Sequence, residues 1–437
     1  MKKLVFLSLF IISAVFTYAQ DATPAPSPAD TTVQAIDTAA TATPAPATAT
    51  TETKAVTPVS ASNQESFNFE SDHYAVRSYV SAEHAQSVAE RLEAYQVEYN
   101  KYFHFDNQKA GVKLKVRIFA NKQRFDQYLQ RLINETRDDF VYLHYSDAAR
   151  SELVGYADPA HAAPEASIAH QGFIQFLRSN VANPPLWLRE GFAVYFEELA
   201  WDPASKTATL HENLSWLETL KDLEMGSRTA DALSMTDLLS LSVDKAREKI
   251  QVFYPQAWAL VNYLARSDNK NHNRILWDSI AQMSPTASLD ENSALVQAKA
   301  FKWEEADSLK TDFDNYFKEK KTYRELVQSG IDQYANGKAK ESEAAFTVAL
   351  GLQDASYVPY YYLGLINYDK GSYSQAETYY QKALEKGASP ALTNYALGVN
   401  AFADNRFEIA TQFLKKTGEL DPSFKDKVAE LIQRMDS

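Results

Sequence analysis

Hydrophobic periodicity divides the chain into a part that mixes strands with helices and a later part that is helical throughout. Residues 112–118 carry apolar side chains at every second position and basic ones between them, which is typical of a half-buried strand with a solvated face. Residues 81–103 carry apolar side chains three and four positions apart, which predicts an amphipathic helix with Ser81 as its N-cap. The other expected elements are extended chain over 67–80, a helix over 122–133, and strands over 140–144 and 152–157. This order predicts an α+β domain with a small mixed sheet.

Two further helices are expected within residues 167–198, separated by the turn Asn183-Pro184-Pro185. The first helix places four residues on one face, and three of them are apolar, as in a buried core helix: His170, Phe173, Ile174 and Leu177. The second helix begins near Trp187 and carries Glu190. A mostly helical subdomain is expected to follow, as far as about Lys321.

The last part of the chain repeats itself every 34 residues. Glycines mark the period at Gly330, Gly364 and Gly398. Small residues fall in the same register at Ser342, Ala376 and Ala410, and large apolar ones at Phe346, Tyr380 and Leu414. Small residues let the two helices of a repeat approach each other, and the large ones fill the space between them. The pattern resembles tetratricopeptide repeats over residues 323–422, an all-α solenoid, and a cap helix is expected over 423–435 with Ser423 as its N-cap.

This resemblance implies that a protein or peptide binds along a groove of the repeat array. Tyr360, Tyr361 and Asn394 lie on the first helices of their repeats and are the candidate partner-binding residues, because aromatic and amide groups suit an extended peptide. The alternative is that the two tyrosines pack against the neighbouring repeat or against the preceding domain.

The helix that carries Glu190 has a recognisable signature. Residues 186–197, LWLREGFAVYFE, resemble the P-x-W-L-x-E-G-x-A-x-Y-x-E pattern of the peptidase MA-like gluzincins, which are zinc metallopeptidases with a zincin-like α+β fold. The resemblance covers roughly residues 66–320, and it implies that Glu190 holds the position of the third zinc ligand.

The preceding helix departs from the His-Glu-x-x-His motif of that family and reads His170-Gln171-Gly172-Phe173-Ile174. Such a peptidase binds zinc through both histidines and uses the glutamate as general base to the metal-bound water. Gln171 is an amide that cannot accept a proton at neutral pH, and Ile174 has no lone pair. We therefore expect vestigial ligand positions at His170, Ile174 and Glu190, a vestigial general-base position at Gln171, no catalytic residue and no cofactor.

The expected function is that of a non-catalytic pseudo-metallopeptidase whose repeats bind a protein or peptide in the cell envelope. One alternative is a zinc-dependent metallopeptidase with an altered metal site. Another is a structural zinc held by His170, Glu190 and a borrowed ligand such as His161. The stretch His211–Ser215 begins like the metal motif but has serine where the second histidine is needed, so it is set aside.

Charge and cysteine content limit which partners and which lipid attachment we expect. The 437 residues carry a net charge of −13, which argues against a nucleic-acid binder. The chain has no cysteine, so we expect no disulfide, no thiolate metal site and no lipid attachment of the kind found in lipoproteins.

The first residues are expected to direct export. Residues 1–19 read as a Sec-type signal peptide with a lysine pair, an apolar core and a small-residue cleavage site. Residues 20–63 are rich in Ala, Thr and Pro and read as a disordered linker. No other segment reads as a membrane span, so we expect a periplasmic, surface or secreted protein. The gluzincin-like domain is then expected over residues 64–321, and the repeats with the cap helix over 322–437.

Overall fold

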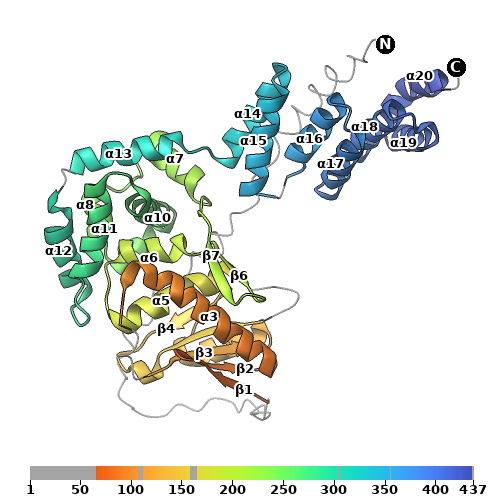
Figure 1. Cartoon of the computed structure of the whole chain (residues 1–437). Helices are drawn as coiled ribbons and strands as arrows, with labels where there is room; N and C mark the ends of the chain where they lie inside the picture. Colours follow the sequence, from red (N-terminus) through yellow and green to blue (C-terminus); the bar gives the residue numbers. More distant parts are fainter. Residues whose placement is uncertain (1–64, 107–111, 158–164, 304–305, 355, 436–437) are drawn as a thin grey trace, which may run out of the picture. The chain divides into compact units, whose positions relative to one another are not determined.

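The computed structural model describes residues 65–106, 112–157, 165–303, 306–354 and 356–435 (Figure 1). The described chain divides into two compact units, one that ends at Glu319 and one that begins at Lys320, called here the first and second units. The signal peptide and linker expected over residues 1–63 lie outside the described residues. Among the described residues, no helix has both the length and the apolar character needed to cross a lipid bilayer.

A five-stranded mixed sheet forms the base of the first unit. Its strands are β1 (Phe67–Glu70), β2 (Tyr74–Ser78), β3 (Leu114–Phe119), β4 (Val141–Leu143) and β5 (Glu152–Tyr156). Their spatial order is β1-β2-β3-β5-β4: the central pairs β2–β3 and β3–β5 are parallel, and the outer pairs are antiparallel. The α+β class expected for this part of the chain is confirmed at this level, and β4 forms one edge of the sheet.

Each face of the sheet packs against helices because successive side chains point to opposite sides. The long helix α3 (Ala82–Phe103) packs with Val76, Val116 and the other residues of the main core on one face. On the other face, Phe125 and Leu129 of α4 (Lys122–Ile133) pack with Phe119, Val154 and Tyr156. The expected N-cap is confirmed: the Ser81 side chain accepts a hydrogen bond from the backbone N–H of His84.

The helix pair follows as α5 (Glu165–Asn180) and α6 (Leu186–Tyr195). The hydroxyl of Tyr99 on α3 donates to the backbone carbonyl of Ala169, at 2.7 Å, which fixes α5 on α3. A Cβ at Gly191 would lie 2.4 Å from the carbonyl oxygen of Ala257, so only glycine lets α6 approach α10 (Ile250–Arg266) this closely.

The rest of the first unit is mostly helical, as expected, but it begins with a hairpin that sequence reasoning missed, β6 (Leu199–Asp202) and β7 (Thr207–Leu210). The remaining helices are α7 (Leu217–Met225), α8 (Met235–Ser240), α9 (Val243–Glu248), α11 (Lys270–Gln282), α12 (Leu289–Ala300) and α13 (Ala306–Glu319).

The second unit is entirely helical in its described residues. Its helices are α14 (Tyr323–Ala335), α15 (Ala339–Leu352), α16 (Tyr357–Asp369), α17 (Tyr373–Glu385), α18 (Pro390–Ala403), α19 (Phe407–Leu420) and α20 (Lys425–Met435). The 34-residue period has a direct structural basis. A Cβ at Gly330, Gly364 or Gly398 would lie 2.4–2.7 Å from the side chains of Phe346, Tyr380 and Leu414 respectively, so each glycine admits the large residue of the next helix.

The expected start of the last helix is wrong. Ser423 lies within a 3-10 turn, Pro422–Phe424, and α20 begins only at Lys425. The side chain of Asp421 accepts the backbone N–H of Ser423 and caps this turn. An aspartate followed by proline begins the turn two residues before the serine, so the serine side chain is not needed as a cap.

Candidate functional site

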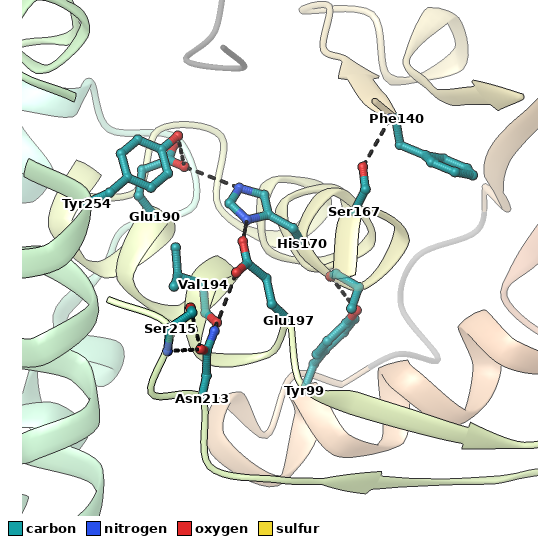
Figure 2. Close-up of polar contacts among 11 residues, drawn as sticks. Tyr99, Phe140, Ser167, His170, Glu190, Val194, Glu197, Asn213, Ser215 and Tyr254 are labelled. Carbon is teal, nitrogen blue, oxygen red and sulfur yellow. Dashed lines mark hydrogen bonds and ion pairs between the residues drawn. The ribbon is translucent and has the colours of Figure 1, made fainter. Parts of the chain in front are cut away.

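His170 lies at the centre of a buried group of charged side chains (Figure 2). Its Nδ1 is 2.8 Å from Oε1 of Glu197, and its Nε2 is 3.6 Å from Oε2 of Glu190. His170 and Glu190 are 0% exposed, and Glu197 is 9% exposed. The structure therefore brings together the two predicted residues His170 and Glu190 and adds Glu197 at the end of the same signature.

Two further side chains hold Glu190 in place. Arg189 Nε donates to Oε1 of Glu190 at 2.6 Å, and the Tyr254 hydroxyl on α10 donates to Oε2 at 3.1 Å. Arg189 is 4% exposed and Tyr254 is 1% exposed. Both carboxylate oxygens thus have protein donors, as a buried carboxylate requires.

Glu197 is oriented by a loop that follows the β6–β7 hairpin. Asn213 Nδ2 lies 2.8 Å from the carbonyl oxygen of Val194 and 3.4 Å from Oε2 of Glu197. The Ser215 hydroxyl donates to Oδ1 of Asn213 at 2.6 Å and so fixes the amide (Figure 2). Both residues belong to the stretch His211–Ser215, which was set aside as a metal motif and instead supports Glu197.

The electrostatics favour a charged histidine. Burial alone would lower the pKa of His170, but its ion pair with Glu190, its hydrogen bond to Glu197 and the negative charges of both acids outweigh that effect and raise the pKa to about 9. Burial would raise the pKa of Glu190, but the positive charges of Arg189 and His170 lower it below its usual range. The formal charges of His170 and Arg189 balance those of Glu190 and Glu197, so the group is neutral as a whole.

Asp139 is a further acid near this group that sequence reasoning missed. The residue is 8% exposed, and its Oδ2 has no hydrogen-bond partner among the described residues. Burial, together with the charge of Asp138, raises its pKa to about 6. A single acid before a short strand carries no sequence signal, because its burial comes from the tertiary structure.

Gln171 has a structural role. Its Oε1 accepts the backbone N–H of Tyr142 at 3.1 Å, and one turn earlier Oγ of Ser167 accepts that of Phe140, also at 3.1 Å. These N–H groups belong to the outer side of the edge strand β4 and the residue before it, so α5 satisfies donors that would otherwise be unpaired. Gln171 thus holds the edge of the sheet.

The side chains that the structure describes around His170 do not make up a zinc site. His170 Nε2 and Glu190 Oε2 are two donor atoms of a possible site, but Ile174 supplies none and is 6% exposed. A zinc site needs three or four protein ligands and, for hydrolysis, a position open to water. Within the described ranges, no three His, Cys, Asp or Glu side chains are grouped so that they could hold a metal. His161, the borrowed ligand of the structural-zinc hypothesis, lies outside the described residues.

The candidate partner-binding residues of the second unit are buried. Tyr360 is 7% exposed, and its hydroxyl donates to Oδ1 of Asp354 at 2.7 Å. Tyr361 is 1% exposed and packs on Tyr380 with ring centroids 5.6 Å apart. Asn394 is 2% exposed, and its amide bonds the carbonyl oxygen of Pro390 within the same helix. These positions lie inside the repeats and present almost no surface.

Other aromatic residues on the first helices of the repeats are only half-buried. Tyr368 on α16 and Tyr395 on α18 both pack beside a small cluster that includes Val399 and Leu431. Sequence reasoning missed them because it chose the tyrosines by their place on the helix, and not by which face the neighbouring repeat covers. They give the first helices partly accessible aromatic surface.

Comparison with known proteins gives the group around His170 no function. A family model described as Protein of unknown function (DUF1570) matches residues 161–287, which is less than a third of the chain. This stretch contains α5, α6 and α10, and therefore His170, Glu190, Glu197 and Tyr254. No curated protein matches the chain.

Proposed function

We propose that this protein is an exported pseudo-metallopeptidase. It combines a zincin-like unit that does not hydrolyse peptides with tetratricopeptide-like repeats that bind a protein or peptide in the cell envelope. The observation that carries the proposal is the closed group around His170, in which Glu190 and Glu197 face the two ring nitrogens and both His170 and Glu190 are 0% exposed.

The chemistry of the group supports a non-hydrolytic role. A peptidase needs a base that can take a proton from water, yet Gln171 is an amide whose oxygen is bonded to the backbone of β4. It also needs an open metal position, yet His170 and Glu190 have no exposed surface. Glu190 neutralises Arg189 and accepts a bond from Tyr254, so it serves the stability of the fold.

Metal content is the first test of this proposal. The full-length protein is produced with added zinc, dialysed against a weak chelator and subjected to elemental analysis beside the His170→Ala variant. We expect far less than one zinc per chain in both proteins, and no cleavage of a generic peptide library. About one zinc per chain in the unmodified protein, lost in His170→Ala, would overturn the proposal.

The second candidate is a zinc peptidase with an altered site, and one observation favours it. His170 Nε2 and Glu190 Oε2 face each other at 3.6 Å, a spacing that two ligands of one metal ion also have. The same metal measurement separates the two candidates, because the altered peptidase requires the zinc and the pseudo-peptidase does not.

The repeats are the proposed binding part. The packing of each register glycine against a large side chain of the next helix supports the tetratricopeptide assignment, and the half-buried rings of Tyr368 and Tyr395 supply contact surface. A displayed library of random peptides is selected on the full-length protein. We expect enriched peptides to lose binding to Tyr368→Ala and Tyr395→Ala but not to Tyr379→Ala, a matched change on the second helix α17. Equal binding to all three variants would refute the assignment of this surface.

A further inference from the structure

The two edges of the five-stranded sheet differ in how the rest of the first unit covers them. At the β4 edge, the Gln171 side chain on α5 accepts the outward backbone N–H of Tyr142. Ser167 does the same for Phe140. At the other edge, β1 pairs with β2 alone among the described strands, and it lies at the outside of the sheet (Figure 1). An edge strand with unpaired backbone groups can pair with a further strand.

The hydrogen bonds between β1 and β2 determine which groups of β1 point outward. The backbone N–H of Ser71 donates to the carbonyl oxygen of Tyr74 at 3.0 Å, so these two residues form a hydrogen-bonded pair of the ladder. Hydrogen-bonded and non-hydrogen-bonded pairs alternate along antiparallel strands, so both phenylalanines of β1 also direct their backbone groups toward β2. The backbone N–H and C=O groups of Asn68 and Glu70 therefore point away from β2, along the free edge.

The side chains of β1 suit a further strand on both faces of the sheet. Phe67 and Phe69 pack against the main core, but both remain partly exposed at its rim. On the opposite face, Asn68 and Glu70 are exposed, and Lys113 neutralises Glu70 at 3.0 Å. A strand added at this edge would cover the remaining surface of both aromatic rings without burying an unpaired charge.

The sequence of β1 is complementary to itself in the antiparallel direction. With Asn68 opposite Asn68 of a second copy, the outward N–H and C=O groups of the two residues bond each other. This register places Phe67 opposite Phe69 of the second copy, so two aromatic pairs lie across the two-fold axis, and such cross-strand pairs stabilise a sheet. It also places Glu70 opposite Ser66. The register centred on Glu70 would instead bring two like charges together, which is unfavourable.

We propose that two copies of this protein associate through their β1 strands, which pair antiparallel across a two-fold axis at Asn68. The pairing joins the two sheets into one continuous sheet. The assembly closes at two copies, because the β4 edge of each sheet is already bonded by α5. A contact built on one short strand gives a weak dimer, with a Kd of about 100 µM. The proposal goes beyond the pseudo-metallopeptidase assignment and does not depend on it.

Sedimentation velocity of the full-length protein, from about 1 µM to about 500 µM, measures the association. We expect a monomer at the lowest concentration and mostly dimer at the highest. Asn68→Pro removes an outward N–H but no bond to β2, so this variant should stay monomeric. Asn68→Ala is the matched control: it keeps the N–H and should dimerise within about threefold of the unmodified affinity. Similar urea midpoints of the two variants, followed by tryptophan fluorescence, show that both are folded.

A disulfide formed between two copies tests the register. The chain has no cysteine, so Asn68→Cys introduces a single thiol at the two-fold axis, where the two Cα atoms lie about 5.5 Å apart and a disulfide can form. Glu70→Cys is the matched control, because its two copies would lie about 14 Å apart along the strands. Under mild oxidation, Asn68→Cys should give a covalent dimer on a non-reducing gel at least about tenfold faster than Glu70→Cys.

Three results would overturn the proposal. The first is a protein that stays monomeric up to about 500 µM. The second is a dimer that persists in Asn68→Pro, because the interface would then lie elsewhere. The third is a variant Asn68→Cys that cross-links no faster than Glu70→Cys.

Discussion

Replacing His170 with glutamine tests the charge balance of the buried group. The substitution removes the cation that lies between Glu190 and Glu197 while keeping a polar side chain of similar size. A histidine pKa raised from 6.5 to about 9 corresponds to roughly 3 kcal/mol of stability, and breaking a buried ion pair by removing one partner costs about 3–5 kcal/mol. We therefore expect His170→Gln to lower the free energy of unfolding of the first unit by about 3–5 kcal/mol at pH 6.5.

The sequence supplies a probe that reports on the first unit alone. All six tryptophans precede Lys320, at positions 187, 201, 216, 258, 277 and 303. Urea unfolding of the full-length protein, followed by tryptophan fluorescence, therefore measures the unit that holds His170 even when the second unit unfolds separately.

A double substitution distinguishes lost charge balance from lost packing. Glu197→Gln removes one of the carboxylates that His170 neutralises, so the double variant should be at least 1–2 kcal/mol more stable than the sum of the single effects implies. His272, also fully buried and bonded to the Tyr263 hydroxyl, is the control. Glu197→Gln should add to His272→Gln within about 0.5 kcal/mol. A cost below about 1 kcal/mol for His170→Gln, or additivity with Glu197→Gln, would refute the reasoning.

Three further outcomes are expected. The folded-state pKa of His170 is raised, so the stability that His170 contributes is complete below about pH 6.5 and is lost as pH rises through about 9. The urea concentration at the unfolding midpoint, measured by fluorescence, should therefore fall across that pH range in the unmodified protein. It should fall much less in His170→Gln. Gly364→Ala should destabilise the second unit by about 1–3 kcal/mol in circular-dichroism melts, because the added Cβ would lie 2.4 Å from the Tyr380 side chain. Gly351→Ala is the control and should be neutral or stabilising, because no atom lies within 4 Å of the added Cβ. Gln171→Glu should cost about 1–3 kcal/mol in the fluorescence assay by burying an unbalanced carboxylate, and an unchanged midpoint would contradict this.

Local signals explain which parts of the fold were predictable. Helix α4 was predicted at its observed bounds, and α3 at its N-cap, because caps and periodicity lie within a few residues of each other. The β6–β7 hairpin was missed because its two short strands alternate weakly and turn through Lys206, a non-glycine residue with a φ of 55°. Ser423 was misassigned because a stronger local signal, Asp421 before a proline, begins the turn earlier.

The site was predictable only in part, for a related reason. His170 and Glu190 were found because a signature places them at fixed positions on two neighbouring helices. Glu197 belongs to the same signature, but its bond to His170 spans 27 residues, and the Tyr254 bond to Glu190 spans 64. Asp139 has no sequence signal at all. Partners of this kind are defined by tertiary packing, which a single sequence does not reveal.

The burial of the His170 group also determines where a ligand of this protein can bind. A group with no exposed atoms on His170 or Glu190 cannot contact a partner unless the first unit opens, and opening would expose charges that are balanced only when the helices are packed. The peptide binding that we propose is therefore assigned to the first helices of the repeats, where half-buried aromatic rings reach the surface.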